Sequence, residues 1–355
     1  MPYIEALSKR DDVEHVWVVA PRLAYTERAA MGWPETWTNS SEKLTIKINP
    51  SDQEVDELFR STSLPCGGGV GGSFCFFSGI TAFPEVYGWF KISLGYKNLK
   101  RGIITEAPYT YDKPLWMHKI KFVLKDYRYI KYIDYVFAIG EDCAKYYRGW
   151  SKRWKVVPFM YCTEVPNLKC QISGGMNLCF VGSLDRRKNV CVLMEALSML
   201  KEMPLNVTIV GDGPERRTLE ESAKTLGKSI VVKFMGALPM EETQKIIAQN
   251  DVLVLPSLHD GWGAVVNEAM MLGTLAICSN KCGAKYLIEK SGMGGVFDVD
   301  SARMLADNIE AIADNLEEQR AERETRITWA VEKISPKAVS EYFYESIAVY
   351  TKSCR

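Results

Sequence analysis

The residues best suited to chemistry lie in the stretch LPSLHDGWGAVVNEAMMLG. Asp260 and Glu268 are separated by seven residues, and Gly261 and Gly263 stand directly before a helical pattern. Backbone N–H groups at a helix start favour an anion, and glycines let that anion approach the main chain closely. Glu268 lies one turn into the helix, where its carboxylate can accept hydrogen bonds from sugar hydroxyls. The pattern suggests a site for a nucleotide diphosphate sugar.

The elements that position these residues form a repeating pattern of strands and helices. From Met176 onward, short apolar runs alternate with helical patterns, as in MNLCFVG, LNVTIVG, VVKFMG, DVLVLPS, TLAICS and GGVFDV. This alternation predicts βα units in a parallel sheet. The first half repeats it less regularly, with strand candidates VEHVWVVAP, KLTIKI, SFCFFSG, RGIITEA and DYVFAIG. The sequence therefore predicts an α/β protein with two sheets, in which ligands bind at the carboxyl ends of the strands.

The domain organisation follows from the length and from the segment between the two halves. A chain of 355 residues exceeds one ordinary core. The segment VVPFMYCTEVPNLKCQISGG contains two prolines and ends in Gly-Gly, which places the boundary near residues 160–174. We expect Rossmann-like domains at 1–165 and 166–335, and a C-terminal helix at 336–355 that packs back on the first domain. Two facing sheets would leave a central cleft.

The composition excludes several classes of function. The 44 basic and 44 acidic side chains cancel, which argues against bulk electrostatic binding to nucleic acid. The ten cysteines form no C-x-x-C pair and no zinc spacing, so we interpret them as reduced, small core residues. No apolar run reaches the length of a membrane-spanning helix. We expect a cytoplasmic protein that is soluble or peripheral at a membrane.

The N-terminus departs from the order expected of such a domain. Met1 is followed at once by PYIEALSKRDDVEHVWVVAP, a helical pattern that leads into a strand. We therefore expect that an opening strand, which would normally precede that helix, is missing. The glycine-rich stretch CGGGVGGSFCFFSG follows a later helix and lacks the Gly-Lys-Ser/Thr ending of a P-loop. We interpret it as a flexible loop before a strand.

The order of four segments resembles the retaining glycosyltransferases of family 4, which have the two-domain GT-B architecture. These segments are FVGSLDRRKNV, VTIVGDGPERRTLEE, VKFMGALPMEETQKIIAQNDVLVLPS and HDGWGAVVNEAMMLG. The resemblance implies that Asp260 contacts hydroxyls of the transferred sugar and that Glu268 holds the nucleotide ribose. It also implies that Lys188, with Arg187 before it, neutralises the leaving diphosphate. Ser183 stands where the family usually has an arginine. The basic cluster could instead be a solvated loop after a strand.

The resemblance extends to the remaining donor contacts. The segment KFMGALP is similar to the loop whose main chain reads the nucleotide base, from Gly236 to Leu238. The GDG sequence at 211–213 is either a plain βα turn or a donor contact. The donor-binding residues implied in this way are Gly182, Arg187, Lys188, Gly236, Leu238, Asp260, Gly261, Trp262, Gly263, Ala264, Val265 and Glu268.

The acceptor side is marked by one carboxylate. Family members often place a histidine beside the reacting sugar, and the corresponding strand end here reads GIITEAPY, with Glu106 at that place. Glu106 could orient the acceptor or accept its proton, or it could simply cap the next segment. The resemblance thus implies Lys188, Asp260 and Glu106 as the catalytic residues.

One further segment has a surface chemistry of its own. In KPLWMHKIKFVLKDYRYIKY, apolar residues follow helical spacing on one side and basic residues line another. Such a helix could rest against anionic lipid, which would suit a lipid-linked acceptor, or it could pack its apolar stripe inward. The apolar residues are Trp116, Ile120, Val123 and Tyr127, and the basic residues are Lys121, Lys125 and Arg128.

The sequence as a whole favours an enzyme that transfers a sugar from a nucleotide diphosphate donor to a hydroxyl acceptor in polysaccharide or glycolipid assembly. By resemblance, the anomeric configuration is retained. We expect no metal and no cofactor besides the donor substrate. Two alternatives are a sugar nucleotide epimerase or phosphorylase of the same plan and a non-catalytic protein that binds the donor.

Overall fold

The computed structural model describes residues 2–22, 41–62, 72–108, 114–165, 168, 170, 172 and 174–353. The described residues belong to two compact units. One contains Cys162–Val339, and the other contains Tyr3–Tyr25, Glu35–Tyr161 and Ser340–Arg355. Glycines 67, 68, 69 and 71 of the glycine-rich stretch and Pro166 of the boundary segment lie outside the described residues.

The unit that contains Cys162–Val339 is built on a six-stranded parallel sheet with the order β12-β11-β10-β7-β8-β9. The chain runs outward from β7 to β9, returns to β10 beside β7, and then continues to the opposite edge. This is the doubly wound order, and its switch point lies between β7 and β10. The strands are β7 (Met176–Val181), β8 (Leu205–Val210), β9 (Ile230–Gly236), β10 (Val252–Leu255), β11 (Leu275–Ser279) and β12 (Gly294–Phe297).

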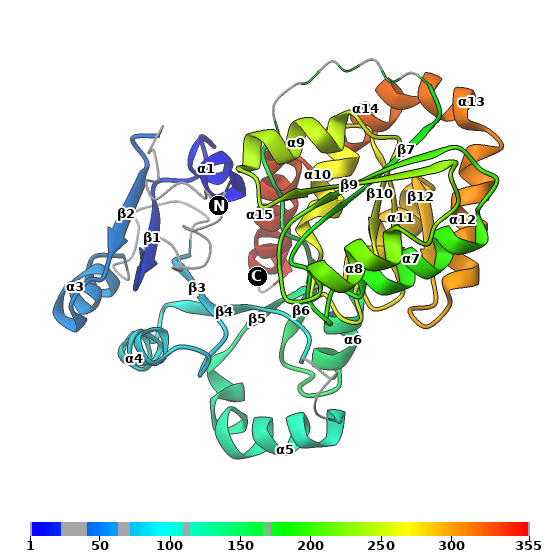
Figure 1. Ribbon diagram of the computed structural model, residues 1–355. Coiled ribbons are helices and arrows are strands. Elements are labelled where there is room, and N and C mark those ends of the chain that lie inside the picture. The colour runs from blue at the N-terminus through cyan, green and yellow to red at the C-terminus, as the bar shows by residue number, and fades with distance from the viewer. Residues whose placement is uncertain are drawn as a thin grey trace. The chain divides into compact units, whose positions relative to one another are not determined.

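Helices cover both faces of this sheet (Figure 1). Helix α7 packs on α8 and α12, whereas α10 packs on α9 and α14. All residues of the central strands β10 and β11 are buried, which explains their unbroken apolar sequences VLVL and LAICS. The helices are α7 (Val190–Met199), α8 (Arg216–Ala223), α9 (Met240–Ala248), α10 (Ala264–Met271), α11 (Lys285–Ser291), α12 (Ala302–Ala313), α13 (Leu316–Ala321) and α14 (Arg323–Ile334).

The other unit contains two sheets among its described residues. A parallel pair, β1-β2, is separate from a four-stranded parallel sheet of order β3-β4-β5-β6. The strands are β1 (Val16–Ala20), β2 (Leu44–Ile48), β3 (Phe74–Ser78), β4 (Lys100–Thr105), β5 (Tyr135–Ile139) and β6 (Lys155–Phe159). The helices are α1 (Pro2–Ser8), α3 (Asp52–Thr62), α4 (Pro84–Ser93), α5 (Leu115–Lys125), the 3₁₀ helix η1 (Tyr127–Tyr132), α6 (Glu141–Arg148) and most of α15 (Pro336–Ser353).

Strand β6 was missed in the sequence, where its residues are part of the proline-containing boundary segment. Pro158 lies inside β6, which is at the edge of the sheet and pairs with β5 alone among the described strands. An edge strand tolerates proline because one side of the strand has no ladder hydrogen bonds to lose. The sheet therefore extends to Phe159 before the chain enters the next unit.

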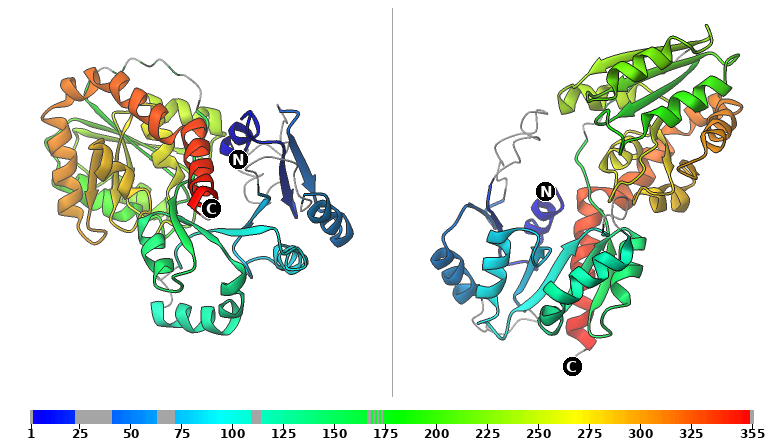
Figure 2. Two further views of the ribbon diagram at one scale, coloured as in Figure 1. Left: turned by 180° about the vertical axis from the view of Figure 1, so that it is seen from behind. Right: turned by 60° about the horizontal axis from the view of Figure 1, so that its bottom comes forward.

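Helix α15, drawn in red in Figure 2, carries Phe343, whose side chain is buried in the core of this unit. The ring of Phe343 lies 4.6 Å from that of Phe137, 4.9 Å from that of Phe76 and 5.8 Å from that of Phe159, measured between centroids. These partners belong to β5, β3 and β6. Helix α15 is thus part of the packing around the four-stranded sheet.

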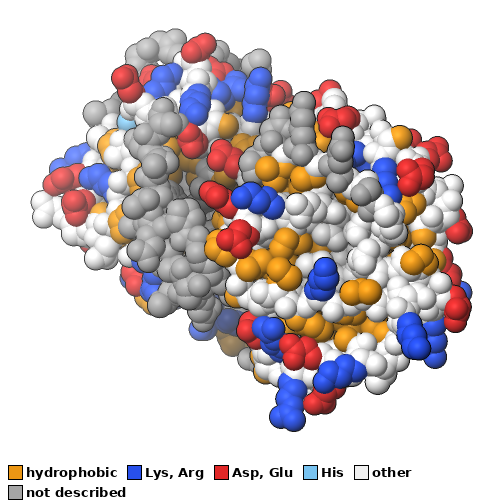
Figure 3. Space-filling model, turned by 45° about the horizontal axis from the view of Figure 1, so that its top comes forward, with side chains coloured by type: hydrophobic (Ala, Val, Ile, Leu, Met, Phe, Trp, Pro, Cys, Tyr) orange, Lys and Arg blue, Asp and Glu red, His pale blue; other side chains and the backbone are white. Residues whose placement is uncertain are grey.

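The surface charges agree with the balanced composition, and the cysteines agree in part with the expectation of reduced core residues. On the face shown in Figure 3, basic and acidic side chains are interspersed among the described residues. Most of the described cysteines are buried or half-buried free thiols, but Cys191 is exposed, so it is not the core residue we expected. In the described part of the chain, no helix has the length and apolar character needed to span a membrane.

Candidate functional site

The candidate site is built by the loops that follow β7 and β10, which lie at the switch point of the six-stranded sheet. Because the two strands are parallel neighbours, their carboxyl ends bring both loops to the same edge. The amide of Leu258 donates to the carbonyl of Arg187 at 2.8 Å and ties the loops together. Residues some 70 positions apart in the chain, Lys188 and Asp260, therefore meet.

An ion pair between these two residues is the centre of the site. Lys188 Nζ lies 2.6 Å from Asp260 Oδ2, and the two side chains are only 13% and 15% exposed. Arg187 Nη1 lies 3.8 Å from the same oxygen and donates to the carbonyl of His259 at 3.4 Å. Two cations thus converge on one carboxylate, and Asp260 Oδ1 has no hydrogen bond among the described residues. The basic loop is therefore partly buried and organised, in contrast to a solvated loop.

The conformation of the loop after β7 depends on a residue that the sequence reasoning did not single out. Asp185 accepts a hydrogen bond from the hydroxyl of Ser183 at 2.7 Å and another from the amide of Lys188 at 3.0 Å. Partial burial opposes the charge of Asp185, but these hydrogen bonds and the charges of Arg187 and Lys188 outweigh it and lower its pKa. The Ser-x-Asp-x-x-Lys spacing was the available signal, since an aspartate commonly closes such a turn. Ser183 acts here on the loop itself.

The turn after β10 is locked by the loop after β11. Asp260 donates its amide to Lys281 and accepts at its carbonyl from the amide of Gly283. Gly263 has φ +88, and a Cβ there would lie 2.6 Å from Cys282 Sγ and 2.7 Å from Leu255 Cδ2. Both the backbone angle and the lack of space require glycine at this position. The turn that opens α10 is consequently held between two strand ends.

Trp262 has a different place from the one expected of a donor-binding side chain. Its indole is 4% exposed and its Nε1 donates to Asn267 Oδ1 at 2.7 Å. The carbonyl of Trp262 accepts from the amide of Ala284 at 2.7 Å. The side chain therefore packs inside the unit and fixes the start of α10, and its indole offers no exposed face to a ligand.

Glu268 lies one turn into α10 with its carboxylate unpartnered. Among the described residues, neither a hydrogen bond nor an ion pair reaches this carboxylate, although the residue is half-buried. Burial raises the pKa of Glu268 to about 7. Ala264 and Val265 form the first turn of the same helix, and Gly263 precedes it as the N-cap without a side-chain hydrogen bond. A buried carboxylate without donors is well placed to accept hydrogen bonds from a ligand.

The two remaining loops at this edge contact each other. The amide of Gly211 donates to the carbonyl of Gly236 at 2.8 Å, and Gly236 has φ +73. A Cβ on Gly211 would overlap the carbonyl oxygen of Gly182. The GDG sequence is thus a close-packed turn against the loop after β7, and a donor contact there stays a prediction. Leu238 follows Gly236, and its carbonyl accepts from Thr243 Oγ1 at 3.5 Å.

Glu106 belongs to the other unit and follows β4. Its side chain is exposed, and Oε1 accepts a hydrogen bond from the hydroxyl of Tyr161 at 2.9 Å. This contact closes the end of β4 against the residues that follow β6. A catalytic role for Glu106 stays a prediction.

The segment that carries the site also carries a family signature. Residues 173–327 match the family described as Glycosyl transferases group 1. The match runs from the start of β7 into α14 and includes Lys188, Asp260 and Glu268. This part of the chain is similar to that family.

A curated relative is similar to about half of the chain. The D-inositol 3-phosphate glycosyltransferase of Corynebacterium urealyticum is 32% identical over 178 residues, which are 48% of this chain and 40% of that protein. The chain matches less than half the length of this relative.

Solved structures have a similar fold over more of the chain. HepE of Anabaena in complex with UDP-glucose has a TM-score of 0.61 at 14% identity and covers 86% of each chain. Sucrose-phosphate synthase of Thermosynechococcus elongatus has a TM-score of 0.64 at 17% identity and covers 99% of this chain and 92% of that one. The predicted α/β class with parallel sheets is confirmed, and the structural matches are to glycosyltransferases of the GT-B fold.

Proposed function

We propose that the chain transfers a hexosyl group from a uridine diphosphate sugar to a hydroxyl acceptor with retention of the anomeric configuration. The observation that carries the proposal is the buried Lys188–Asp260 pair at the switch point, followed on α10 by the unpartnered carboxylate of Glu268. The choice of uridine rests on HepE, which is described in complex with UDP-glucose. The match of residues 173–327 to the group 1 family supports the reaction class.

The cationic side chains would act on the leaving group. When the acceptor oxygen attacks C1 of the sugar, the bond from C1 to the phosphate oxygen breaks and the diphosphate leaves with the electron pair. The acceptor proton passes to a phosphate oxygen on the same face. Lys188 and Arg187, with the first amides of α10, would stabilise the negative charge that grows on the diphosphate. Their partial burial strengthens this effect, because the surroundings screen charge less than water does.

The two carboxylates would hold the sugars of the donor. Asp260 positions Lys188 through Oδ2, and its free Oδ1 can accept from a hydroxyl of the transferred sugar. Glu268 would accept from the ribose hydroxyls, which supplies the donors that its carboxylate lacks in this structure. The main chain from Gly236 to Leu238 would lie beside the base.

The acceptor in this proposal is lipid-linked, and α5 is the element that supports it. Only Phe122 of this helix is buried, in contact with Trp150 at 4.4 Å between ring centroids. Trp116 is 60% exposed and Leu124 is 76% exposed. The apolar stripe therefore does not pack inward. The exposed apolar residues are Leu115, Trp116, Met117, Ile120, Val123, Leu124 and Tyr127, and exposed basic residues among them are Lys119, Lys121, Lys125 and Arg128.

This combination fits an anionic membrane surface. Exposed aromatic and aliphatic side chains can enter the boundary between headgroups and acyl chains, while lysine and arginine contact anionic headgroups. The acidic residue within this stretch, Asp126, accepts a hydrogen bond from Thr81 Oγ1 at 2.8 Å and so is held away from such a role. Contiguous exposed apolar side chains of this kind mark interaction surfaces.

The first experiment tests donor use. Purified protein is incubated with UDP-glucose and UDP-galactose and with isoprenoid- or diacylglycerol-linked hydroxyl acceptors, and sugar transfer is followed by mass spectrometry. Transfer that is lost in Lys188→Ala and kept in the exposed control Lys201→Ala supports the proposal. Donor binding without transfer to any acceptor would favour a binding protein instead.

The second experiment tests the membrane surface. Co-sedimentation compares vesicles of pure phosphatidylcholine with vesicles that contain phosphatidylglycerol. We expect binding to the anionic vesicles, weakened by salt and reduced at least about tenfold in Leu124→Glu. Met235→Glu on β9 is the control, because Met235 is an exposed apolar residue outside α5. Equal binding by both variants would remove α5 from the proposal.

A further inference from the structure

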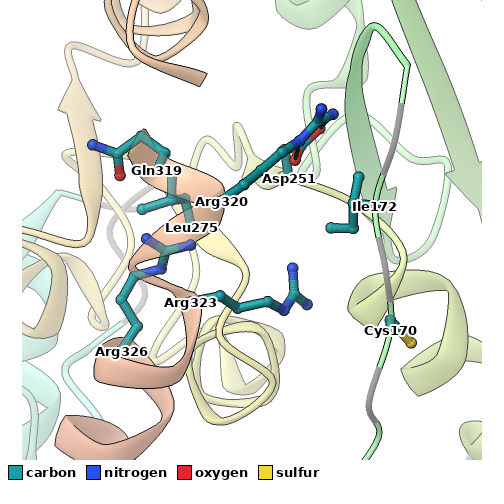
Figure 4. Close-up of a pocket in the computed structure, with 8 residues that line it drawn as sticks. All are labelled: Cys170, Ile172, Asp251, Leu275, Gln319, Arg320, Arg323 and Arg326. Atoms are coloured by element: carbon teal, nitrogen blue, oxygen red, sulfur yellow. Dashed lines mark hydrogen bonds and ion pairs between the residues drawn. The ribbon is translucent and has the colours of Figure 1, made fainter. Parts of the chain in front are cut away.

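A cavity lies at the amino ends of the strands of the six-stranded sheet, whereas the donor loops follow their carboxyl ends. The cavity has a volume of about 350 Å³ and is lined by Asp251, which directly precedes β10, and by Leu275, the first residue of β11. Three arginines from α13 and α14 face it: Arg320, Arg323 and Arg326 (Figure 4). None of the residues that line it belongs to the donor site.

One of these arginines is neutralised. Arg320 forms a two-pronged pair with Asp251, with Nε 2.9 Å from Oδ1 and Nη2 3.0 Å from Oδ2. Asp251 Oδ2 also accepts from the amide of Asn177 at 2.8 Å. The carboxylate is therefore fully used by these donors and has little capacity left for the other two arginines.

The other two arginines have no carboxylate partner among the described residues. Arg323 Nη2 donates to the carbonyls of Ala248 and Leu272 at 2.6 and 2.8 Å, so its donors are used while its charge stays unneutralised. Arg326 Nε donates to the carbonyl of Gly273 at 3.0 Å, but its Nη1 is buried without a partner among the described residues. Arg326 is only 6% exposed. A buried cation with an unused donor is unfavourable unless an anion meets it.

The pKa shifts of Arg323 and Arg326 also indicate that an anion would stabilise these two side chains. Burial, followed by the positive charge of Arg323, lowers the pKa of Arg326 to about 10. Burial also lowers the pKa of Arg323. Both guanidinium groups remain charged near neutral pH and repel each other. Arg320 also pairs with Glu317 at 3.2 Å, so Arg323 and Arg326 are the two lining cations without a carboxylate partner among the described residues.

We propose that this cavity binds the dianion of a phosphomonoester. Arg326 Nη1 would donate to a phosphate oxygen, and Arg323 would supply the second positive charge, so that a dianion matches the two arginines that lack a carboxylate partner. In Figure 4 the Arg323 side chain extends toward the segment that carries Cys170 and Ile172, which form the opposite wall. The volume leaves room beyond the phosphate, and Leu275 and Ile172 offer apolar contact to the organic part of the ester.

Thermal stability with inorganic phosphate and with glycerol 3-phosphate tests this site. The measurement is made at pH 8, where the phosphate is dianionic, against sodium chloride at equal ionic strength. We expect the melting temperature to rise with either probe, and the apparent Kd to increase at least tenfold in Arg326→Gln. Without phosphate, Arg326→Gln should melt no lower than the unaltered protein, because a buried unmatched charge is removed.

Two controls separate this cavity from other anion sites. Arg217→Gln removes an exposed arginine that pairs only with Glu221, and it should keep the full phosphate response. Lys188→Ala should also keep it, because Lys188 lies in the donor loops. A response lost in Lys188→Ala and kept in Arg326→Gln would assign the anion to the donor site and overturn the proposal.

A third measurement needs no variant. Cys170 lines the cavity as a half-buried free thiol. Phosphate should therefore slow its alkylation, followed by peptide mass spectrometry, while the exposed Cys191 reacts at an unchanged rate. Alkylation of Cys170 at the same rate with and without phosphate would contradict the proposal even if Arg326→Gln failed to fold.

Discussion

At both ends of the strands of the six-stranded sheet, an ion pair lies near a charged side chain that has no partner among the described residues, and the sign of this unpaired charge differs between the two ends. At the carboxyl edge, Lys188 is paired with Asp260 while the carboxylate of Glu268 has no partner. At the amino edge, Arg320 is paired with Asp251 while Arg326 Nη1 has none. At each end, the ion pair stabilises the local structure, and the charged group without a partner indicates which kind of ligand could bind there. Hydroxyl donors suit the first edge, and an oxyanion suits the second.

Burial acts on both of these charged groups and moves their pKa values in opposite directions. It raises the pKa of Glu268 to about 7 and lowers that of Arg326 to about 10. Only the carboxylate therefore changes charge near neutral pH. Variants and pH can consequently separate the two edges, and most of the effects expected from them fall at the donor edge.

The largest effect is expected from Lys188→Ala. Turnover should fall by about 100-fold, because charge that stabilises the leaving diphosphate is removed in the transition state. Steady-state kinetics with Lys201→Ala as the control measure it. A higher Michaelis constant at unchanged turnover would instead make Lys188 a uniform binding contact.

Glu268→Gln should weaken UDP-glucose binding by about tenfold or more at pH 8. A carboxylate that accepts from two ribose hydroxyls becomes an amide with one acceptor oxygen, and charge-assisted hydrogen bonds are lost. Calorimetry gives the dissociation constant, with the exposed Glu289→Gln as the matched control. Equal affinity in all three proteins would take Glu268 out of the donor site.

The affinity for UDP-glucose should rise as pH increases from 6 to 8. The pKa of Glu268 is about 7 in the free protein, and binding favours its ionised form. At pH 6 only about a tenth of the carboxyl groups are ionised, so the apparent Kd should be about tenfold higher than its limiting value. UDP-glucose has no phosphomonoester that titrates in this range. A slope that persists in Glu268→Gln would assign the titration to another group.

The same carboxyl group should affect stability with the opposite trend. Because its folded pKa is raised above the ordinary value of 4.5, its ionisation costs stability progressively between pH 4.5 and 7. Glu268→Gln should therefore stabilise the ligand-free protein at pH 8 by up to about 3 kcal/mol and have little effect at pH 4.5. Urea unfolding at the two pH values provides the test. Equal differences at both would show that the gain is not electrostatic.

The smallest effect is expected from Trp262→Phe. The indole donates to Asn267 inside the unit, so its loss should cost about 1 kcal/mol of stability and leave UDP affinity nearly unchanged. Denaturation and calorimetry on one preparation measure both quantities. A loss of affinity without a loss of stability would return Trp262 to the donor contacts.

Sequence reasoning succeeded where local spacing determines position. The strand-turn-helix pattern around Asp260 and Glu268, and the lysine after β7, were sufficient because strand order places these turns at one edge. The pattern could not show that Asp185 organises the loop or that Trp262 faces inward, since both depend on contacts between loops. Arg326 had no local signal at all. Its burial arises from helix packing against strand ends far away in the chain.

The position of Phe343 has a consequence for synthesis on the ribosome. Its ring lies among Phe76, Phe137 and Phe159, so the core around the four-stranded sheet is incomplete until α15 has been translated. The unit that contains Cys162–Val339 has all its strands before that helix emerges. Although its strands are translated later, this unit can complete its core first, while the earlier strands await Phe343.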